Sequence, residues 1–253
     1  MSLIQLVIFD MAGTTVRDRK EVEGCFAEAA RQTGLIVSGE RITAVQGWAK
    51  RFVFETLWTE QLGAGDPSIP ERVDHSYAVF RDILENHYRT QSVEPTEGCL
   101  DTFRLLREQG IAIALTTGFY RKVTNIILER LGWNAGLDDQ YRGTPESLIQ
   151  LSVASDEVAQ GRPAPDLIFR VMETLGISDP QAVVNLGDTP SDLESGRRAG
   201  VRLSLGITNG THTADQLRPY DSDGLIGSLR ELPAFLAERN LILPENRTQA
   251  ISN

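Results

Sequence analysis

The first hydrophobic run of the chain, residues 3–9, is short, rich in β-branched side chains and does not alternate with polar positions. Such a run predicts a strand that is buried on both faces. Three similar runs predict further strands at 111–115, 182–186 and 202–205, and apolar residues at helical spacing predict helices at 99–108, 121–131 and 191–199. Alternating strands and helices are typical of an α/β fold, a parallel sheet with helices on both faces.

A purely helical stretch interrupts this alternation after the first strand. Residues 21–34, 39–62 and 70–88 carry polar side chains on one face and aromatic or aliphatic side chains on the other. Because the stretch follows the carboxyl end of a strand, we expect it to lie over the crevice where open α/β sheets bind ligands. The sequence therefore predicts a Rossmann-like core at 1–18 and 91–253, with an inserted all-helical cap domain at 19–90.

Composition narrows the class of protein. The 253 residues are 41% hydrophobic and 24% charged, as in an ordinary soluble globular chain. The formal net charge of −10 repels polyanions, so we expect neither nucleic acid nor an acidic membrane surface as a partner. Two cysteines, Cys25 and Cys99, are too few for a disulfide framework and are expected to be buried in a reducing compartment. With no long apolar run and no basic leader, a cytoplasmic location is expected.

Polar residues follow the apolar runs at four places. They are Asp10, the pair Thr116 and Thr117, the loop around Arg162, and Asp188 with Asp192. We expect these loops to converge, because the carboxyl ends of parallel strands share one edge of the sheet. Carboxylates are suited to Mg²⁺, and a guanidinium and a hydroxyl are suited to phosphoryl oxygens. The backbone amides after Asp10, at Gly13 and Thr14, could line an anion site.

Each of these residues also has a purely structural interpretation. Asp10 and Asp188 could cap turns, and Asp192 could satisfy a helix dipole. Thr116 and Thr117 could cap the following helix, with that role favoured for Thr116, while Arg162 could form a surface ion pair. The histidines at 75, 87 and 212 share no metal-ligand spacing and are expected to be surface or satisfied polar residues.

The segments LVIFDMAGTTV, ALTTG, GRPAPD and NLGDTPSD resemble, in order, the four motifs of the haloacid dehalogenase superfamily. Ala12 and Arg162 make the chain more similar to phosphonoacetaldehyde hydrolases, or phosphonatases, within it. The resemblance implies that Asp10 is the nucleophile and that Mg²⁺ is held by Asp10, Asp188 and the Ala12 carbonyl. It also implies that Thr117 and Arg162 contact the phosphoryl group and that Asp192 positions metal-bound water.

Ala12 replaces an acid that most of the superfamily uses to protonate the leaving alcohol. The resemblance to phosphonatases implies an alternative, in which a cap lysine forms a Schiff base with the substrate aldehyde. Lys50, in the sequence Gly47-Trp48-Ala49-Lys50, is the candidate, with Trp48 as a roof and Gly118 beside Thr117. The chain departs from the phosphonatase pattern, which has Met, His and Tyr, at Gln46, Val53 and Phe119.

Three functions follow from these residues. The first is Mg²⁺-dependent hydrolysis of a small phosphonate or phosphate through an aspartyl-phosphate, with phosphonoacetaldehyde-like substrates favoured. The second is a phosphomonoesterase in which water or substrate replaces the acid lost at Ala12 and Lys50 binds a carboxylate or second phosphate. Lys50 could also have no functional role and lie on a solvated helix face. The third, a non-catalytic phosphate-binding protein, is disfavoured because it needs no nucleophile such as Asp10. The aromatic-rich cap is also compatible with a homodimer.

Overall fold

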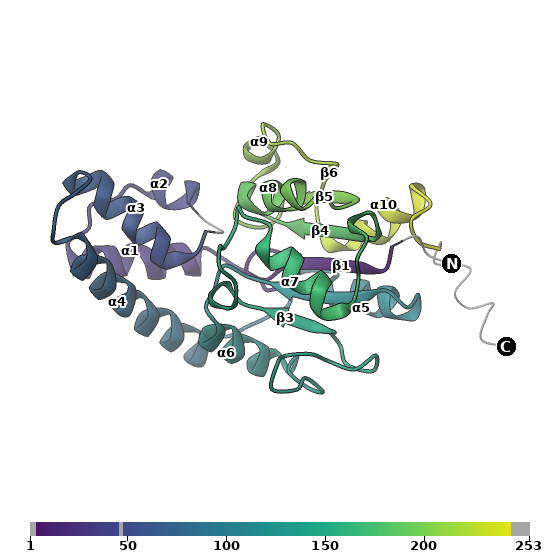
Figure 1. The fold of residues 1–253 in the computed structure, drawn as a ribbon. Coiled ribbons are helices and arrows are strands. Elements are labelled where there is room, and N and C mark those ends of the chain that lie inside the picture. The colour runs from purple at the N-terminus through teal and green to yellow at the C-terminus, as the bar shows by residue number, and fades with distance from the viewer. Residues whose placement is uncertain (1–3, 46–47, 244–253) are drawn as a thin grey trace.

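The computed structural model describes residues 4–45 and 48–243. Figure 1 shows a sheet with helices around it and a separate group of helices to one side. The strands are β1 (Leu6–Asp10), β2 (Ala112–Thr116), β3 (Leu151–Val153), β4 (Val183–Gly187), β5 (Leu203–Ile207) and β6 (Gly224–Ile226).

The helices follow the chain as α1 (Glu21–Thr33), α2 (Gly39–Ala44), α3 (Lys50–Leu62), α4 (Ile69–Thr90), α5 (Cys99–Glu108), α6 (Arg121–Leu131), α7 (Asp166–Leu175), α8 (Pro190–Ala199), α9 (Ala214–Leu217) and α10 (Leu232–Glu238). Short 3₁₀ turns occur at Ser155–Glu157, Pro180–Ala182 and Leu229–Glu231. Within the described part of the chain, no helix is long and apolar enough to cross a membrane.

The sheet is parallel throughout, and its strands lie in the order β3-β2-β1-β4-β5-β6. The first strand of the chain is therefore central, with β2 on one side and β4 on the other. Asp10, the last residue of β1, is in register with Thr116, the last residue of β2. This order brings the loops after β1, β2 and β4 to adjacent positions at one edge.

Helices cover both faces of the sheet. Side chains alternate across β1, so that Val7 and Phe9 pack with Phe103 of α5 and Leu236 of α10. Leu6 and Ile8 point to the opposite face and pack with α7 residues such as Leu167, Ile168 and Val171. Both faces of this central strand are apolar, which explains its uninterrupted hydrophobic run. The predicted α/β fold with helices on both faces of a parallel sheet is confirmed.

The helices α1, α3 and α4 pack through an aromatic cluster of their own. The ring of Phe26 stacks on Phe54 at 4.4 Å between centroids, and Phe80 lies 5.8 and 6.0 Å from these two rings. The indole of Trp58 donates a hydrogen bond of 2.9 Å to the Ser76 hydroxyl. These helices occupy the place in the chain predicted for the insertion, although the bounds 19–90 remain a prediction.

The helix predicted over residues 39–62 is two helices in the structure. The first ends at Ala44 and the second begins at Lys50. Ile42 and Val53 are buried on either side of the break, so the apolar pattern continues across it and periodicity could not reveal it. Gln46 and Gly47, which the sequence analysis singled out, lie outside the described residues, as does Leu3. The break places Lys50 at the start of a helix.

Several short elements were not predicted. The strands β3 and β6 have three residues each, too few for a hydrophobic period to be read. The loop of Arg162 was expected at a strand end, but it instead precedes α7, after β3 and a 3₁₀ turn. The two cysteines are free and buried, as expected.

Candidate active site

Three carboxylates meet at the edge of the sheet where β1 and β4 end. Asp10, Asp188 and Asp192 are buried, and one oxygen from each lies within 4.8 Å of the others. Asp10 closes β1, Asp188 follows β4, and Asp192 lies in the first turn of α8. The predicted convergence of these loops is therefore present in the structure.

The side chain of Arg162 lies inside this acid cluster. Its guanidinium is buried, hydrogen bonds to Oδ1 of Asp10, and lies 2.7 Å from Oδ1 of Asp192. A second nitrogen donates to the hydroxyl of Thr116 at 2.5 Å. Arg162 is thus no surface ion pair, and Thr116 serves as its acceptor rather than as a helix cap.

Burial dominates the ionisation of the cluster. Desolvation raises the pKa of Asp10 well above its usual range, against the attraction of Arg162 and with added repulsion from Asp192 and Asp188. Desolvation and the charge of Asp192 raise the pKa of Asp188 to about 6. Three carboxylates around one guanidinium leave excess negative charge, which a cation would relieve.

Hydrogen bonds fix the orientation of two of these carboxylates. Asp188 accepts the backbone N–H of Thr211 at 2.6 Å and the hydroxyl of Thr14 at 3.1 Å. Asp192 accepts the backbone N–H of Thr189 at 3.1 Å and its hydroxyl at 2.5 Å. Held in this way, the carboxylate oxygens need little rearrangement to bind a ligand.

The donor set fits Mg²⁺. Oδ1 of Asp192 is buried and, among the described residues, receives no hydrogen bond of good geometry, although it lies 2.7 Å from the Arg162 guanidinium, so its hydrogen-bonding capacity is not filled. The backbone also comes close to the cluster, because a Cβ built on Gly13 would lie 2.2 Å from Oδ2 of Asp188. Gly13 has a φ of +89°, which favours glycine for the same turn. Hard carboxylate oxygens beside a close backbone loop suit a small divalent cation.

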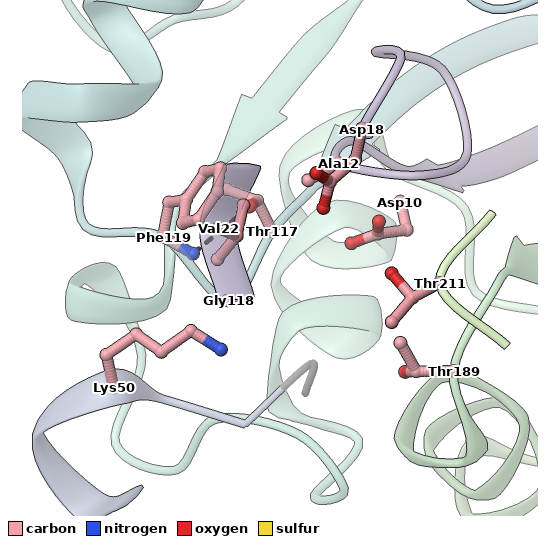
Figure 2. A pocket seen from close by; sticks show the side chains of 10 residues that line it. All are labelled: Asp10, Ala12, Asp18, Val22, Lys50, Thr117, Gly118, Phe119, Thr189 and Thr211. Atoms are coloured by element: carbon pink, nitrogen blue, oxygen red, sulfur yellow. Dashed lines mark hydrogen bonds between the residues drawn. The ribbon is translucent and has the colours of Figure 1, made fainter. Parts of the chain in front are cut away.

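A small cavity, partly open to solvent, extends from Asp10 towards α3. Figure 2 shows the side chains that line it. They are Asp10, Ala12, Asp18, Val22, Lys50, Thr117, Gly118, Phe119, Thr189 and Thr211. Of the predicted site residues, the structure therefore brings Asp10, Ala12, Lys50, Thr117 and Gly118 to one cavity.

Lys50 reaches this cavity from the opposite side to Asp10. Its side chain is buried and points into the space between α3 and the strand ends (Figure 2). Burial lowers the pKa of its amine from 10.5 to about 8, although the carboxylates of Asp18 and Asp10 act in the other direction. A lysine of this kind carries a neutral, nucleophilic amine in a useful fraction of molecules near neutral pH.

The remaining predicted site residues have other contacts. Thr14 hydrogen bonds Asp188, and Gly13 packs against it, so these two support the acid cluster rather than line the cavity. The Thr117 hydroxyl lines the cavity and accepts the backbone N–H of Phe119 at 3.1 Å, which keeps a local capping role. Trp48 is half-buried with its ring 5.6 Å from Phe52, and it is not among the described residues that line the cavity.

Sequence reasoning missed several residues of this region, Val22 and Thr189 of the cavity lining among them. Asp18 and Thr211 line the cavity, and neither lies in one of the four motifs. His212 was expected at the surface or with its polar atoms satisfied, but it is buried and its Nδ1 has no partner among the described residues. Asp18 had one available signal, its position in the loop that follows Asp10.

Known proteins are similar to this chain in sequence and in fold. The model of the haloacid dehalogenase-like hydrolases matches residues 4–200. This chain belongs to the haloacid dehalogenase-like hydrolases. A phosphonoacetaldehyde hydrolase of Latilactobacillus sakei is 29% identical over 94% of this chain and 97% of its own length. One from Bacteroides fragilis is 30% identical over 84% of this chain and 79% of its own.

The solved structures agree on the fold of this hydrolase. A phosphonoacetaldehyde hydrolase-like protein from Oleispira antarctica superposes with a TM-score of 0.77 at 19% identity, over 99% of this chain and 95% of that one. At this identity the likeness supports the fold alone. The chemistry of this haloacid dehalogenase-like hydrolase must therefore be inferred from the residues of its own cavity.

Proposed function

We propose that this hydrolase cleaves a small phosphonate, phosphonoacetaldehyde or a close analogue. In this proposal Asp10 attacks phosphorus and forms an aspartyl-phosphate, while Lys50 holds the carbonyl end of the substrate as an imine. The observation that carries the proposal is the buried Lys50 amine in the same small cavity as Asp10. Relatives that cover nearly the whole chain are named phosphonoacetaldehyde hydrolases, which supports this substrate class.

The phosphoryl end of the substrate would lie against the sheet edge. Asp10 is the candidate nucleophile and lines the cavity together with Thr117. The Thr117 hydroxyl and Arg162, which pairs with Asp10, would contact phosphoryl oxygens. Asp10, Asp188 and Asp192, with the Ala12 carbonyl, would hold Mg²⁺, which neutralises phosphoryl charge when bound. Arg162 is paired with Asp10 in the structure, so substrate oxygens would share or replace that contact.

The carbonyl end would lie near Lys50. A protonated imine at this position accepts the electron pair of the carbon–phosphorus bond and becomes a neutral enamine, so cleavage needs no acid at position 12. The apolar side chains of Val22 and Phe119 line the same space and reduce the access of water. This arrangement explains how Ala12 is compatible with catalysis.

We propose that residues 19–90, which include α1 to α4, act as a cap over the core at 1–18 and 91–253. They supply Lys50 and Val22 to the cavity, whereas β1 and the loop after β2 supply Asp10 and Thr117. The start of α3 is also close to the Arg162 loop, because a Cβ on Gly161 would lie 3.2 Å from that of Ala49. Movement of the helices would therefore open and close the cavity.

Trapping of the imine tests this function. The chain has three lysines, Lys20, Lys50 and Lys122, so a labelled site is easily assigned by peptide mass. Phosphonoacetaldehyde with borohydride should add one reduced two-carbon group to the wild type and to Lys122→Arg. Lys50→Ala should remain unlabelled. An absent adduct, or one at another lysine, would contradict the imine mechanism.

A phosphomonoesterase is the second candidate. Phe119 and Val53, which replace Tyr and His of the phosphonatase pattern, are both buried and offer no proton donor. A protonated Lys50 would then bind an anionic group of a phosphate ester rather than form an imine. Release of phosphate from small phosphate esters, with no release from phosphonoacetaldehyde, would favour this function.

We also propose that the chain forms a homodimer, as expected from the sequence. Phe52 in α3 and Ile36 before α2 are exposed to 52% and 86%, so the helical region has apolar surface available for a partner copy. Light scattering of the full chain is expected to give twice the monomer mass, and a monomer at all concentrations would contradict this.

A further inference from the structure

Asp18 is a carboxyl group in the cavity to which the steps above give no role. It belongs to the loop between β1 and α1 and lines the cavity together with Asp10 and Ala12. Figure 2 shows Asp18 on the side of the cavity away from Lys50. A substrate held between Asp10 and Lys50 would therefore meet this carboxyl group near its phosphorus end.

A neighbouring carboxylate affects the protonation of Asp18. One Asp18 oxygen accepts the backbone N–H of Glu21 at 2.8 Å, and the two side chains are close enough to interact. Burial, followed by the hydrogen bond and charge of Glu21, raises the pKa of Asp18 to about 7. Burial also opposes ionisation of Glu21, but the bond from Asp18 and those from the backbone outweigh it and lower the pKa of Glu21. These opposite shifts favour a proton on Asp18, whose side chain lines the cavity.

Other ionisable groups also face Asp18. Its charge acts on Lys50 of α3, Cys25 of α1 and Tyr88 of α4, and Asp188 of the acid cluster acts on it. Of these groups only Lys50 is a cation, and it belongs to the proposed imine. Asp18 is therefore the carboxyl group of the cavity that stands outside the acid cluster.

Cleavage of the carbon–phosphorus bond leaves a carbon that needs a proton. We propose that the Asp18 carboxyl is the acid that protonates this carbon, in place of the acid that is missing at Ala12. The inference rests on the proposed function, because it requires the enamine on Lys50. It also extends that function, since the imine explains departure of the carbon from phosphorus but not its conversion to a methyl group.

The atoms balance in four steps. Asp10 bonds to phosphorus as the bond between carbon and phosphorus breaks, its electron pair forms the carbon–carbon double bond of the enamine, and the C=N pair of the starting iminium moves to nitrogen. The enamine carbon then takes the proton of the Asp18 carboxyl, which leaves an Asp18 carboxylate and an iminium on Lys50. Water releases acetaldehyde from that iminium and returns Lys50 as an ammonium, while Asp18 regains a proton from solvent. A second water hydrolyses the aspartyl-phosphate, which releases phosphate and returns Asp10.

A structural role for Asp18 is the competing explanation, because it accepts the first N–H of α1. Asp18→Asn separates the two roles. An asparagine keeps an oxygen for the Glu21 N–H but cannot act as an acid at this pKa. Asp66→Asn is a matched control, because Asp66 also accepts a backbone N–H, that of Ser68 at 2.8 Å, just before α4.

Rapid-quench measurement of phosphate from phosphonoacetaldehyde in Mg²⁺ tests the proposal. Asp18→Asn should release about one phosphate per site at the wild-type rate and then turn over ~10²- to 10⁴-fold more slowly, the usual contribution of a general acid. The burst is expected because bond cleavage precedes the missing proton transfer. Asp66→Asn should match the wild type, and Asp18→Glu, which restores a carboxyl, should lose the burst and regain much of the rate.

Four other outcomes would overturn the proposal. An unchanged steady-state rate in Asp18→Asn, or a loss of the burst and the steady state in equal proportion, would show that Asp18 has only a structural role. If Asp18→Asn does not fold, a burst in Asp18→Glu like that expected for the asparagine would exclude the acid role. A wild-type chain that releases no phosphate overturns the proposed substrate and this proton transfer together.

Discussion

The two sides of the cavity are built differently. On the sheet side, Asp188, Asp192 and Arg162 are buried and fixed by short hydrogen bonds or ion pairs. On the helix side, Lys50 lies among apolar groups such as Val22 and Phe119. The first arrangement suits a phosphoryl group and a cation, which need preset charge. The second suits a neutral amine, which needs desolvation.

This difference indicates which side of the cavity would determine substrate choice. In the proposed function, any phosphate or phosphonate could bind at the sheet side, because the proposed contacts there involve only phosphoryl oxygens. Only a substrate with a carbonyl group can use a neutral amine at Lys50. Changes on the sheet side should therefore affect every substrate, whereas changes on the helix side should affect only some.

Loss of the nucleophile should have the largest effect. We expect Asp10→Asn to lower phosphate release from phosphonates and esters alike by roughly 10⁴-fold or more. The fold should survive, because asparagine has nearly the same size and shape and Arg162 keeps its ion pair with Asp192. Phosphate release and the thermal unfolding midpoint measure the two effects. Activity within tenfold of the wild type would exclude Asp10 as the nucleophile.

Removal of the buried Arg162 guanidinium should have the second largest effect, a loss of stability. Arg162→Met leaves Asp10 and Asp192 without their ion pair, and such losses cost about 3–5 kcal/mol in free energy of unfolding. Urea unfolding in EDTA measures this. Arg104→Met is the matched control, because its pair with Asp101 is exposed and should contribute about 0–1 kcal/mol. Equal effects of the two changes would contradict the contrast between buried and surface pairs.

Binding of Mg²⁺ should stabilise the sheet side. At a concentration about 100 times the dissociation constant, a cation that binds only the folded chain adds about 2.7 kcal/mol to its stability. Thermal unfolding with Mg²⁺ and with EDTA measures the shift in midpoint. Asp192→Asn should reduce that shift, and Asp66→Asn should leave it unchanged, since Asp66 lies far along the chain in an unrelated turn. If Mg²⁺ shifts the unfolding midpoint equally in the wild type, Asp192→Asn and Asp66→Asn, the cluster holds no cation.

The buried lysine should produce the smallest effect, and it should depend on pH. The folded chain binds the Lys50 proton less tightly than the unfolded chain, so stability should rise as pH increases from about 8 towards 10.5. Lys50→Met removes this cost and should stabilise the chain by about 1–2 kcal/mol at pH 7, with a gain that shrinks above pH 8. Urea unfolding at pH 7 and 9.5 checks both statements.

Lys122→Met is the matched control for this change. Lys122 is exposed and pairs with Glu85 at 2.8 Å, so its removal should give no gain that shrinks with rising pH. A destabilised Lys50→Met chain at pH 7, with no dependence on pH, would contradict a lysine whose charge is disfavoured by burial.

The sheet side was largely predictable from sequence. Buried parallel strands give continuous apolar runs, and polar residues directly after them must lie at one edge, so Asp10 and Asp188 could be placed together. The pairing of Arg162 with Asp10 was not predictable, because the Arg162 loop follows a strand of only three residues. Local pattern cannot locate a side chain that enters a site from such a loop.

The helix side was predictable only in part. Lys50 was found through its sequence context, but the break that places it at the start of α3 left no trace in the apolar spacing. Asp18 was missed because a lone acid in a loop is common, and its environment depends on Glu21 and on the packing of α1. The raised pKa of Asp18 depends on tertiary structure and cannot be read from the amino-acid sequence.

One comparison of two substrates tests the central claim most directly. Phosphate release should be measured for wild type, Lys50→Ala and Lys122→Arg, with phosphonoacetaldehyde and with ethyl phosphate, which has no carbonyl group. Lys50→Ala should release phosphate from phosphonoacetaldehyde at least ~10³-fold more slowly than the wild type. Its rate of phosphate release from ethyl phosphate, if the wild type has any, should change by less than about tenfold. Wild-type cleavage of phosphonoacetaldehyde that persists in Lys50→Ala would contradict the imine mechanism.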